Sequence, residues 1–266
     1  MASGAPSAND PIIRFENVCK SFGSKVVYAG LNLAVNSGET LTIMGGSGVG
    51  KSVMLKLLIG LLKVDSGRIW FQGQEITSMS ERQLGVLRQR IAMLFQGAAL
   101  FDSLSVGENV AYGLHEHFRA TMSEDDIAKR VTWALSLVGL PGVEAMMPAD
   151  LSGGMKKRVG LARAVAVRPD VVLYDEPTTG LDPINTGRIN HMINGLKRAL
   201  GVTSLVVTHD MQSAFAVSDR IAMVRHGKIL ASGTPEEIRA SSNPYLHDFI
   251  HGHAPVQEDV ETLLST

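Results

Sequence analysis

The stretch "TLTIMGGSGVGKSVMLKLLIGLL", residues 40–62, decides the fold. An apolar run of five residues leads into a glycine-rich loop, and a segment with helical periodicity follows. The loop, residues 45–52, matches the pattern G-x-x-x-x-G-K-[ST], and a preceding strand and a following helix are the setting that a phosphate-binding loop requires. The bare pattern arises by chance in roughly one chain of this length in a hundred. We therefore predict a nucleotide-binding site.

Each part of this loop has an expected role. Its glycines let the backbone curl so that successive N–H groups point at the phosphates, and the helix N-terminus adds partial positive charge. Lys51 is expected to reach the β- and γ-phosphates, and the Ser52 hydroxyl to bind Mg²⁺. The predicted ATP contacts in the loop are Gly45, Gly46, Ser47, Gly48, Val49, Gly50, Lys51 and Ser52.

Outside the loop, apolar runs alternate with helical patterns, which predicts an α/β fold. The runs "VVLYD" (171–175) and "SLVVTHD" (204–210) resemble buried parallel strands that end in polar residues, where ligands bind in open α/β sheets. Residues 12–18 and 31–35 alternate between apolar and polar side chains, which predicts antiparallel strands.

The pattern becomes helical between residues 97 and 150. Ser123 and Asp126 form a capping-box-like start. One helical face then follows, made of Ile127, Val131, Ala134, Leu135 and Val138. This predicts a helical subdomain inserted into the core.

The predicted organisation therefore has four parts. Residues 1–10 form a flexible N-terminus, 11–96 and 151–235 an ATP-binding core, 97–150 the helical subdomain, and 236–266 a C-terminal extension. In the extension one helix face is expected, made of Tyr245, Leu246, Phe249 and Ile250. That face packs either on the chain's own core or on a second copy.

Composition limits the functions that are open to the chain. The net charge of −1 over 266 residues does not favour nucleic acid as a partner. Cys19 is the single cysteine, so no intrachain disulfide can form. There is neither a signal-peptide pattern nor an apolar run long enough for a transmembrane helix. Any membrane role is expected to come through a partner.

Polar residues at the predicted strand ends are candidates for catalysis. Asp175 is the expected Mg²⁺ partner and Glu176 the expected general base, with a surface acidic turn as the alternative. His209 ends another strand, from which it reaches toward the γ-phosphate. Gln96 follows the run "IAMLF", and its amide is expected to contact Mg²⁺ and the attacking water. Spacing alone leaves both His209 and Gln96 open to a structural role.

The stretch "LSGGMKKRVGLARA" (151–164) is, in isolation, an ordinary serine N-cap with glycines before a helix. It stands, however, in a fixed order with the phosphate loop, Gln96, "VVLYDEP", "TGLD" and His209. As an ordered set over residues 11–235, these motifs resemble the nucleotide-binding subunit of ABC transporters. The resemblance implies the ABC ATPase fold: a RecA-like core with an antiparallel β subdomain and an inserted helical subdomain.

The resemblance also implies roles for matching residues. Phe22 would stack on adenine, Gln96 would sense the membrane partner, and His209 would be the switch histidine. ATP and Mg²⁺ are the implied ligands, and ATP hydrolysis the implied reaction. Two copies of the chain would face each other head to tail, each closing over the ATP of the other. The residues that would act across this dimer are Ser152, Gly153, Gly154 and Asp182.

Two longer blocks narrow the resemblance. "MLFQGAALFDSLSVGENVAYGL" (93–114) and "MMPADLSGGMKKRVGLARAVA" (146–166) resemble the ATPase of Mla/MCE-type lipid transporters. This implies phospholipid transport between the inner and outer membranes, in support of outer-membrane lipid asymmetry, from the cytoplasmic face of the inner membrane. The implied partners are an integral membrane permease, a periplasmic MCE-domain protein and a small STAS-domain protein.

Three alternatives to a lipid transporter stay open. A small-solute importer ATPase shares the same chemistry. A soluble ABC ATPase of translation or DNA repair is disfavoured, because the chain has one cassette and no heptad run. A nucleotide-binding module without enzyme activity is disfavoured by Glu176 and His209.

Residues 97–118 carry much apolar surface for a loop region. The apolar residues are Leu100, Phe101, Leu104, Val106, Tyr112 and Leu114. We expect a groove here that receives a short permease helix. The alternative is that these residues only close the core of the helical subdomain.

Overall fold

The computed structural model describes residues 11–253, so the predicted flexible segment 1–10 and the end of the C-terminal extension lie outside the described residues. The first sheet is antiparallel, in the order β2-β1-β4-β5, with strands β1 (Ile13–Phe22), β2 (Lys25–Val35), β4 (Ser66–Phe71) and β5 (Gln74–Glu75). The second follows the order β10-β9-β3-β8-β7-β6, with strands β3 (Thr40–Met44), β6 (Ile91–Leu94), β7 (Val171–Asp175), β8 (Thr203–Val207), β9 (Arg220–Arg225) and β10 (Lys228–Gly233). The predicted α/β class and the antiparallel strands are confirmed, and the strands lie where predicted except that β8 ends at Val207, two residues before His209.

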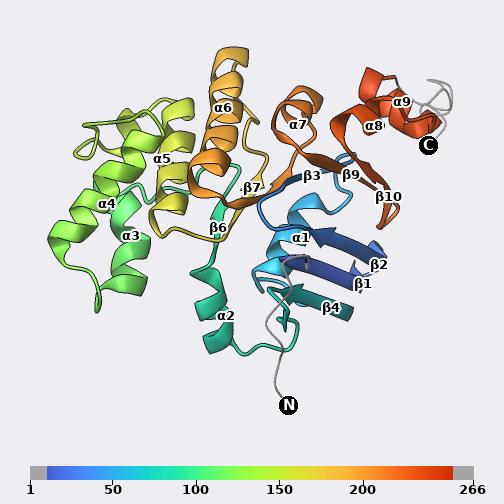
Figure 1. The fold of residues 1–266 in the computed structure, drawn as a ribbon, viewed down its shortest axis with the longest axis horizontal. Helices are drawn as coiled ribbons and strands as arrows, with labels where there is room; N and C mark the ends of the chain where they lie inside the picture. The colour runs from blue at the N-terminus through green and yellow to red at the C-terminus, as the bar shows by residue number, and fades with distance from the viewer. Residues whose placement is uncertain (1–10, 254–266) are drawn as a thin grey trace.

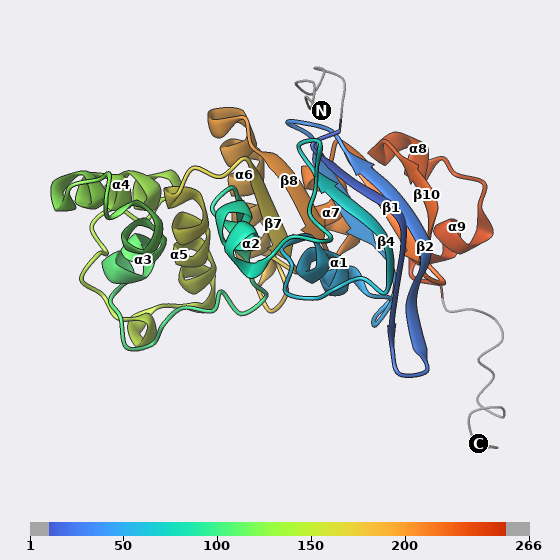
Figure 2. The same cartoon turned by 90° about the horizontal axis from the view of Figure 1, so that it is seen from below.

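Helices surround the second sheet (Figures 1 and 2). They are α1 (Lys51–Leu58), α2 (Glu81–Arg88), α3 (Val106–Phe118), α4 (Glu124–Leu137), α5 (Gly153–Ala166), α6 (Pro183–Leu200), α7 (Met211–Val217), α8 (Pro235–Arg239) and α9 (Pro244–His251), with a short 3₁₀ helix, η1 (Pro148–Asp150). The helix α1 lies between the two sheets, and α3, α4 and α5 gather at the opposite end of the molecule from α8 and α9.

The register of the second sheet decides where the polar strand ends lie. Val207 of β8 pairs in parallel with Ile43 of β3 and also with Asp175 of β7. Leu94 of β6 is level with Tyr174 of β7. Because these strands are parallel, their carboxyl ends form one edge of the sheet. The phosphate loop, both acidic residues, His209 and Gln96 therefore leave the sheet at that edge.

The central strands β3, β7 and β8 are fully buried because both faces of the sheet are covered there. On β7, Val171 and Leu173 join the core around α1, whereas Val172 and Tyr174 join the core under the helices of the other face. All four side chains are fully buried. This explains why the sequence of β7 shows no alternation of polar and apolar residues.

The predicted helical segment folds as expected at α4. Ser123 and Asp126 form the capping box, and the predicted face from Ile127 to Val138 is buried. The helix α5 packs on α3 and α4 and also on β6. The predicted boundary at residue 150 thus falls just before a helix that contacts both parts of the chain.

One detail of the prediction for residues 97–118 is wrong. Val106 and Leu114 lie on α3 rather than in a loop, and both are fully buried in the core shared with α4 and α5. Phe101 and Tyr112 remain 41% and 46% exposed. The segment therefore divides into core-closing residues and an exposed aromatic pair.

The C-terminal extension folds back on the chain's own core. On α9, Leu246 is fully buried in a cluster with Met44, Ile221 and Met223. The guanidinium of Arg225 lies 3.8 Å from the centre of the Tyr245 ring. The sequence left open whether this helix packs on the chain's own core or on a second copy. Residues 244–251 pack on the chain's own core.

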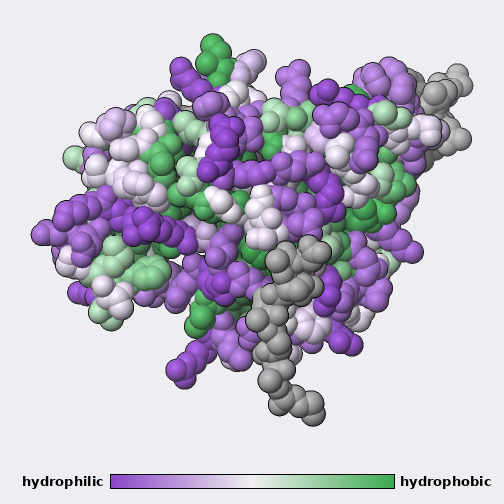
Figure 3. All heavy atoms as spheres, in the orientation of Figure 1, coloured by the Kyte–Doolittle hydropathy of each residue, from purple (hydrophilic) through white to green (hydrophobic). Residues whose placement is uncertain are grey.

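No helix within residues 11–253 is long and apolar enough to cross a membrane. On the face shown in Figure 3, hydrophilic residues predominate and hydrophobic ones are interspersed among them.

Replacing Leu246 with Ala should release α9 without unfolding the rest. Loss of a buried leucine costs about 2–5 kcal/mol, and here the cost is carried by a short terminal helix. We expect amide hydrogen exchange in α9 to become more than about tenfold faster, while exchange in β3 and β7 stays unchanged. Leu230→Ala, at a residue that is 37% exposed, is the control. Unchanged protection of α9 would contradict the packing described above.

Candidate nucleotide-binding site

The phosphate loop joins β3 to α1 in a shape that only glycine tolerates at two positions. Gly45 has a φ of 153°, and a Cβ there would lie 2.6 Å from the carbonyl oxygen of Val224. Gly50 has a φ of 103°, and its Cβ would lie 2.3 Å from Val27. Larger residues would push the loop away from β9 and β2. Steric contacts therefore explain why the G-x-x-x-x-G-K-[ST] pattern has glycine at positions 45 and 50.

Lys51 begins α1 and folds its side chain back over the loop. Its Nζ donates to the carbonyl oxygens of Gly45 (2.8 Å) and Gly46 (3.1 Å). Burial lowers the pKa of Lys51, while the carboxyl groups of Glu176 and Asp175 act to raise it. The ammonium group is thus held at the mouth of the loop, where anionic phosphate oxygens would replace the carbonyl partners.

Ser52 and Asp175 meet across the gap between α1 and β7. The Ser52 hydroxyl donates to Oδ1 of Asp175 over 2.6 Å. Burial raises the pKa of Asp175, and the hydrogen bond from Ser52 opposes that shift. A hydroxyl and a carboxylate side by side are hard oxygen ligands of the kind that Mg²⁺ prefers. The pair that the sequence predicts as the magnesium site therefore fits that ion.

Glu176 sits immediately beyond β7 with an unusual φ of 49°. Its Oε2 lies 2.9 Å from Nδ1 of His209 and accepts hydrogen bonds from the hydroxyls of Thr208 (3.2 Å) and Thr179 (3.2 Å). Its Oε1 has no protein partner within residues 11–253. Positive φ in a non-glycine residue is strained, and such strain gathers at functional sites. Protein contacts thus hold Oε2 of Glu176, while Oε1 remains available to a ligand in the cavity.

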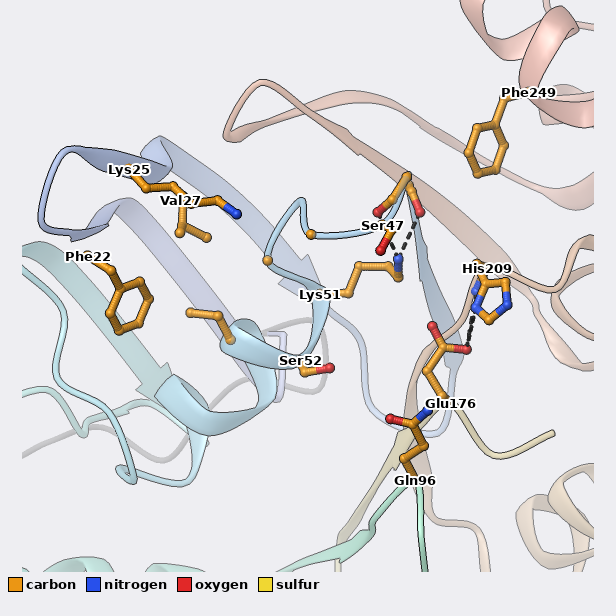
Figure 4. Close-up of a pocket in the computed structure, with 15 residues that line it drawn as sticks. Phe22, Lys25, Val27, Ser47, Lys51, Ser52, Gln96, Glu176, His209 and Phe249 are labelled. Atoms are coloured by element: carbon orange, nitrogen blue, oxygen red, sulfur yellow. Dashed lines mark hydrogen bonds and ion pairs between the residues drawn. The ribbon is translucent and has the colours of Figure 1, made fainter. Parts of the chain in front are cut away.

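These groups line a cavity of about 710 Å³ (Figure 4). Its walls are formed by Phe22, Lys25, Val27, Gly45, Gly46, Ser47, Gly48, Gly50, Lys51, Ser52, Val53, Gln96, Glu176, His209 and Phe249. Phe22 is 47% exposed at the end of β1, on the opposite side of the loop from His209. Asp175 lies behind Ser52 rather than on the wall, and Val49 packs its side chain against the core around α1.

The residues predicted to act across a dimer lie outside this cavity. Ser152 is the N-cap of α5, where its Oγ accepts from the Met155 amide (3.3 Å). Ser152 and Gly153 are exposed, while Gly154 is buried beside Asn185. Asp182 caps α6 and accepts from the Ile184 and Asn185 amides, both at 3.0 Å. Within one chain, then, these groups are not part of the cavity wall.

Three supporting contacts escaped the sequence analysis. The Tyr28 hydroxyl donates to the Gly50 carbonyl (2.7 Å), and Thr208 and Thr179 hold Glu176. The contacts of Tyr28 and Thr208 join segments that meet only in the fold, whereas Thr179 lies three residues after Glu176 in the same loop. Phe249 was expected on an apolar helix face, but its place on the cavity wall was not predicted.

Lys157 is the most informative of the missed residues. It lies on α5, is only 6% exposed, and donates to the carbonyl oxygens of Pro177 (2.8 Å), Thr179 (2.7 Å) and Glu176 (3.3 Å). Burial lowers its pKa, and the charge of Glu176 opposes this. A lysine among basic residues on a helix resembles a solvated side chain in sequence. Here it ties the signature helix, which is α5 with the signature motif "LSGGM" (residues 151–155) at its start, to the loop that carries Glu176.

A phosphate loop, paired carboxylates at a strand end and a parallel sheet define a phosphate-loop nucleotide-binding protein. The ABC transporter family profile matches residues 28–179. The chain is 41% identical over 246 residues, 92% of each chain, to the intermembrane phospholipid transport system ATP-binding protein MlaF of Haemophilus influenzae. The chain therefore belongs to the ABC transporter ATP-binding family, as the motifs predict, and is an ATPase of that family.

Other relatives agree on the family and the fold. The chain is 40% identical to the chloroplastic protein TRIGALACTOSYLDIACYLGLYCEROL 3 of Arabidopsis thaliana, over 94% of this chain and 76% of that protein. A solved dimer of the ATP-binding cassette MJ0796, in a post-hydrolysis state with ADP and Pi, superposes with a TM-score of 0.77 at 30% identity. That match covers 84% of this chain and 98% of the other. The predicted ABC ATPase fold is confirmed.

Replacing Lys157 with Met should weaken both stability and turnover. Methionine keeps an unbranched side chain, one atom shorter, but leaves three carbonyl groups without their donor, which costs about 1–3 kcal/mol. Because the Glu176 loop would shift, we expect ATP turnover to fall at least about tenfold. Lys156→Met is the matched control, since the Lys156 side chain makes no hydrogen bond within residues 11–253. Denaturant unfolding and phosphate release measure the two effects, and equal behaviour of both variants would refute the role of Lys157.

Proposed function

We propose that the chain is the ATPase subunit of a transporter that moves phospholipid between membranes. The observation that carries this proposal is similarity along the whole chain, 41% over 92% of both proteins, to an ATP-binding protein named for intermembrane phospholipid transport. The segments around Gln96 and the signature, which set the chain apart from small-solute importers in sequence, support it. The ATPase itself contacts no cargo, so its own site specifies only the nucleotide.

The proposed chemistry follows from the cavity. Residues 45–52 hold the triphosphate of ATP, with Lys51 at the β- and γ-phosphates and Phe22 against adenine. Ser52 and Asp175, assisted by Gln96, hold Mg²⁺, which when bound neutralises phosphate charge. Free Oε1 of Glu176 accepts the proton of the attacking water, while His209 fixes the orientation of the carboxylate through Oε2. The 2.9 Å contact between His209 and Glu176 supports this assignment.

The proposed active site is completed by a second copy of the chain. The N-terminus of α5 presents the Ser152 hydroxyl and the amides of Gly153 and Gly154, which together suit an anion. These groups do not line the nucleotide cavity of their own chain. In the proposed dimer these groups, with Asp182 nearby, would contact the γ-phosphate of the ATP that is bound by the second copy. Each ATP would then be held by both copies of the chain. Hydrolysis would then release the dimer.

Glu176→Gln should trap this dimer. The amide keeps the size of the side chain but cannot accept the proton of water, so turnover should fall about a hundredfold or more while ATP still binds. We expect an ATP-dependent dimer in sedimentation or light scattering. Adding Ser152→Arg to the same chain should abolish the dimer and spare nucleotide binding to the monomer, because the block lies on the partner-facing surface. A double variant that still dimerises with ATP would refute the arrangement in trans.

The exposed aromatic pair is the proposed docking point for the permease. The rings of Phe101 and Tyr112 lie 4.6 Å apart, just beyond the segment that carries Gln96. Arg163 of α5 approaches the Phe101 ring within 5.8 Å and donates to the carbonyl oxygens of Ala98 and Ala99, each over 2.7 Å. A permease helix seated here would contact a loop that is braced against the signature helix. Through this permease the chain would lie at the cytoplasmic face of the inner membrane, with MCE- and STAS-domain proteins as further partners.

Reconstitution tests the cargo. The chain and its candidate permease are inserted into liposomes that contain a fluorescent phospholipid, and acceptor vesicles are added. We expect ATP-dependent lipid exchange that is lost in Glu176→Gln. The charge-introducing variant Phe101→Asp should lose the permease while keeping nucleotide binding. If amino acids or sugars stimulate the ATPase and no phospholipid moves, the chain serves a small-solute importer instead.

A further inference from the structure

The helix α9 carries a group of side chains that the nucleotide site does not use. Residues 247–253 read "HDFIHGH", a spacing of histidines H-x-x-x-H-x-H with an aspartate after the first. Histidine-rich tracts of this kind are a compositional sign of metal binding. On the helix, His247 and His251 are one turn apart and project from the side opposite to Leu246 and Phe249. The apolar side of α9 is thus packed, and its histidine side faces solvent.

Three of these side chains, His247, Asp248 and His253, lie close together. Nδ1 of His247 lies 3.7 Å from Oδ1 of Asp248, and Nδ1 of His253 lies 3.8 Å from the same oxygen. One ligand atom from each of the three residues lies within 4.8 Å of the others. Ligand atoms at the corners of a zinc tetrahedron are roughly 3.3 Å apart, given metal–ligand distances of about 2.0–2.1 Å. Small side-chain rotations therefore close the site around an ion.

The backbone at the end of α9 holds this arrangement. Gly252 adopts a left-handed conformation, with a φ of 67°, and turns the chain back along the helix. The amide of His253 then donates to the carbonyl oxygen of Asp248 over 2.8 Å. This capping bond fixes His253 beside Asp248. The convergence therefore rests on a helix C-cap and not only on free side-chain rotation.

His251 adds a fourth group next to the three. Its Nδ1–H donates to the carbonyl oxygen of His247 over 2.8 Å, which leaves Nε2 of the neutral ring with a free lone pair. Histidines that bind metals commonly donate their other ring N–H to a backbone carbonyl in this way. The centre of the ring lies 4.3 Å from that of His247 and 5.8 Å from that of His253.

We propose that His247, Asp248 and His253 bind one divalent transition-metal ion of the zinc class. Two imidazoles and one carboxylate are nitrogen-rich, borderline ligands that suit Zn²⁺, Ni²⁺ or Cu²⁺ far better than Mg²⁺. The side chains of His247, Asp248 and His253 are 56%, 47% and 61% exposed, so an ion reaches them from solvent. This site differs from the Ser52–Asp175 pair in its ligand atoms, because that pair offers only oxygen atoms.

Calorimetric titration with Zn²⁺ tests the proposal on the full chain, purified without an affinity tag. We expect one ion per chain, and the same affinity in the presence of excess Mg²⁺. His247→Ala and His253→Ala should each raise the dissociation constant at least about tenfold. His191→Ala, which removes an exposed histidine on α6, should leave it unchanged. Far-ultraviolet circular dichroism of all variants confirms that each is folded.

Two results would overturn the proposal. The first is a wild-type chain that takes up no Zn²⁺ at concentrations well above those of the protein. The second is a His247→Ala, His253→Ala double variant that binds Zn²⁺ with wild-type affinity and stoichiometry, which would place the ion elsewhere. Neither result would bear on the ATP site, because no variant touches the cavity wall.

Discussion

Parallel pairing in the order β3, β8, β7 and β6 is the constraint on which the functional site depends. Since Val207 is level with both Ile43 and Asp175, the phosphate loop, the acidic pair and His209 leave the sheet at one edge. A shift of one residue in any strand would turn its side chains to the other face of the sheet. The buried, β-branched residues on both faces fix that register, so packing energy far from the nucleotide sets the geometry at its phosphates.

The signature helix α5 links the parts of the site that the sheet does not. At its first turn Ser152 faces outward, Lys157 then holds the carbonyls beyond Glu176, and Arg163 holds those of Ala98 and Ala99. Ala98 and Ala99 have positive φ, at 61° and 47°, a conformation that needs such outside support. One helix thus connects the surface proposed to face a second chain, the acidic loop and the segment after Gln96.

The sequence predicts those features whose cause is local. Residues 171–175 form a strand as expected, because their short continuous apolar run is itself the sequence sign of a buried strand, and Ser123 caps α4 through a contact with a residue only three positions away. Lys157 and Thr208 could not be assigned, since their partners lie 20 and 32 residues away and adjoin only through the folded sheet. Val106 and Leu114 were misplaced for the same reason: whether an apolar face is buried depends on the neighbouring helices, α4 and α5, and not on its own spacing.

The helix α9 has two faces with different surroundings, and this joins the histidine group to the nucleotide cavity. Leu246 anchors one face in the core of β3 and β9, and Phe249 extends from the same face to the cavity wall. The opposite face carries His247 and His251, whose ring centres lie 4.3 Å apart. A helix of eight residues moves as a unit, so whatever restrains one face also restrains the other. The position of Phe249 on the cavity wall therefore depends on how firmly the last turn of α9 is held.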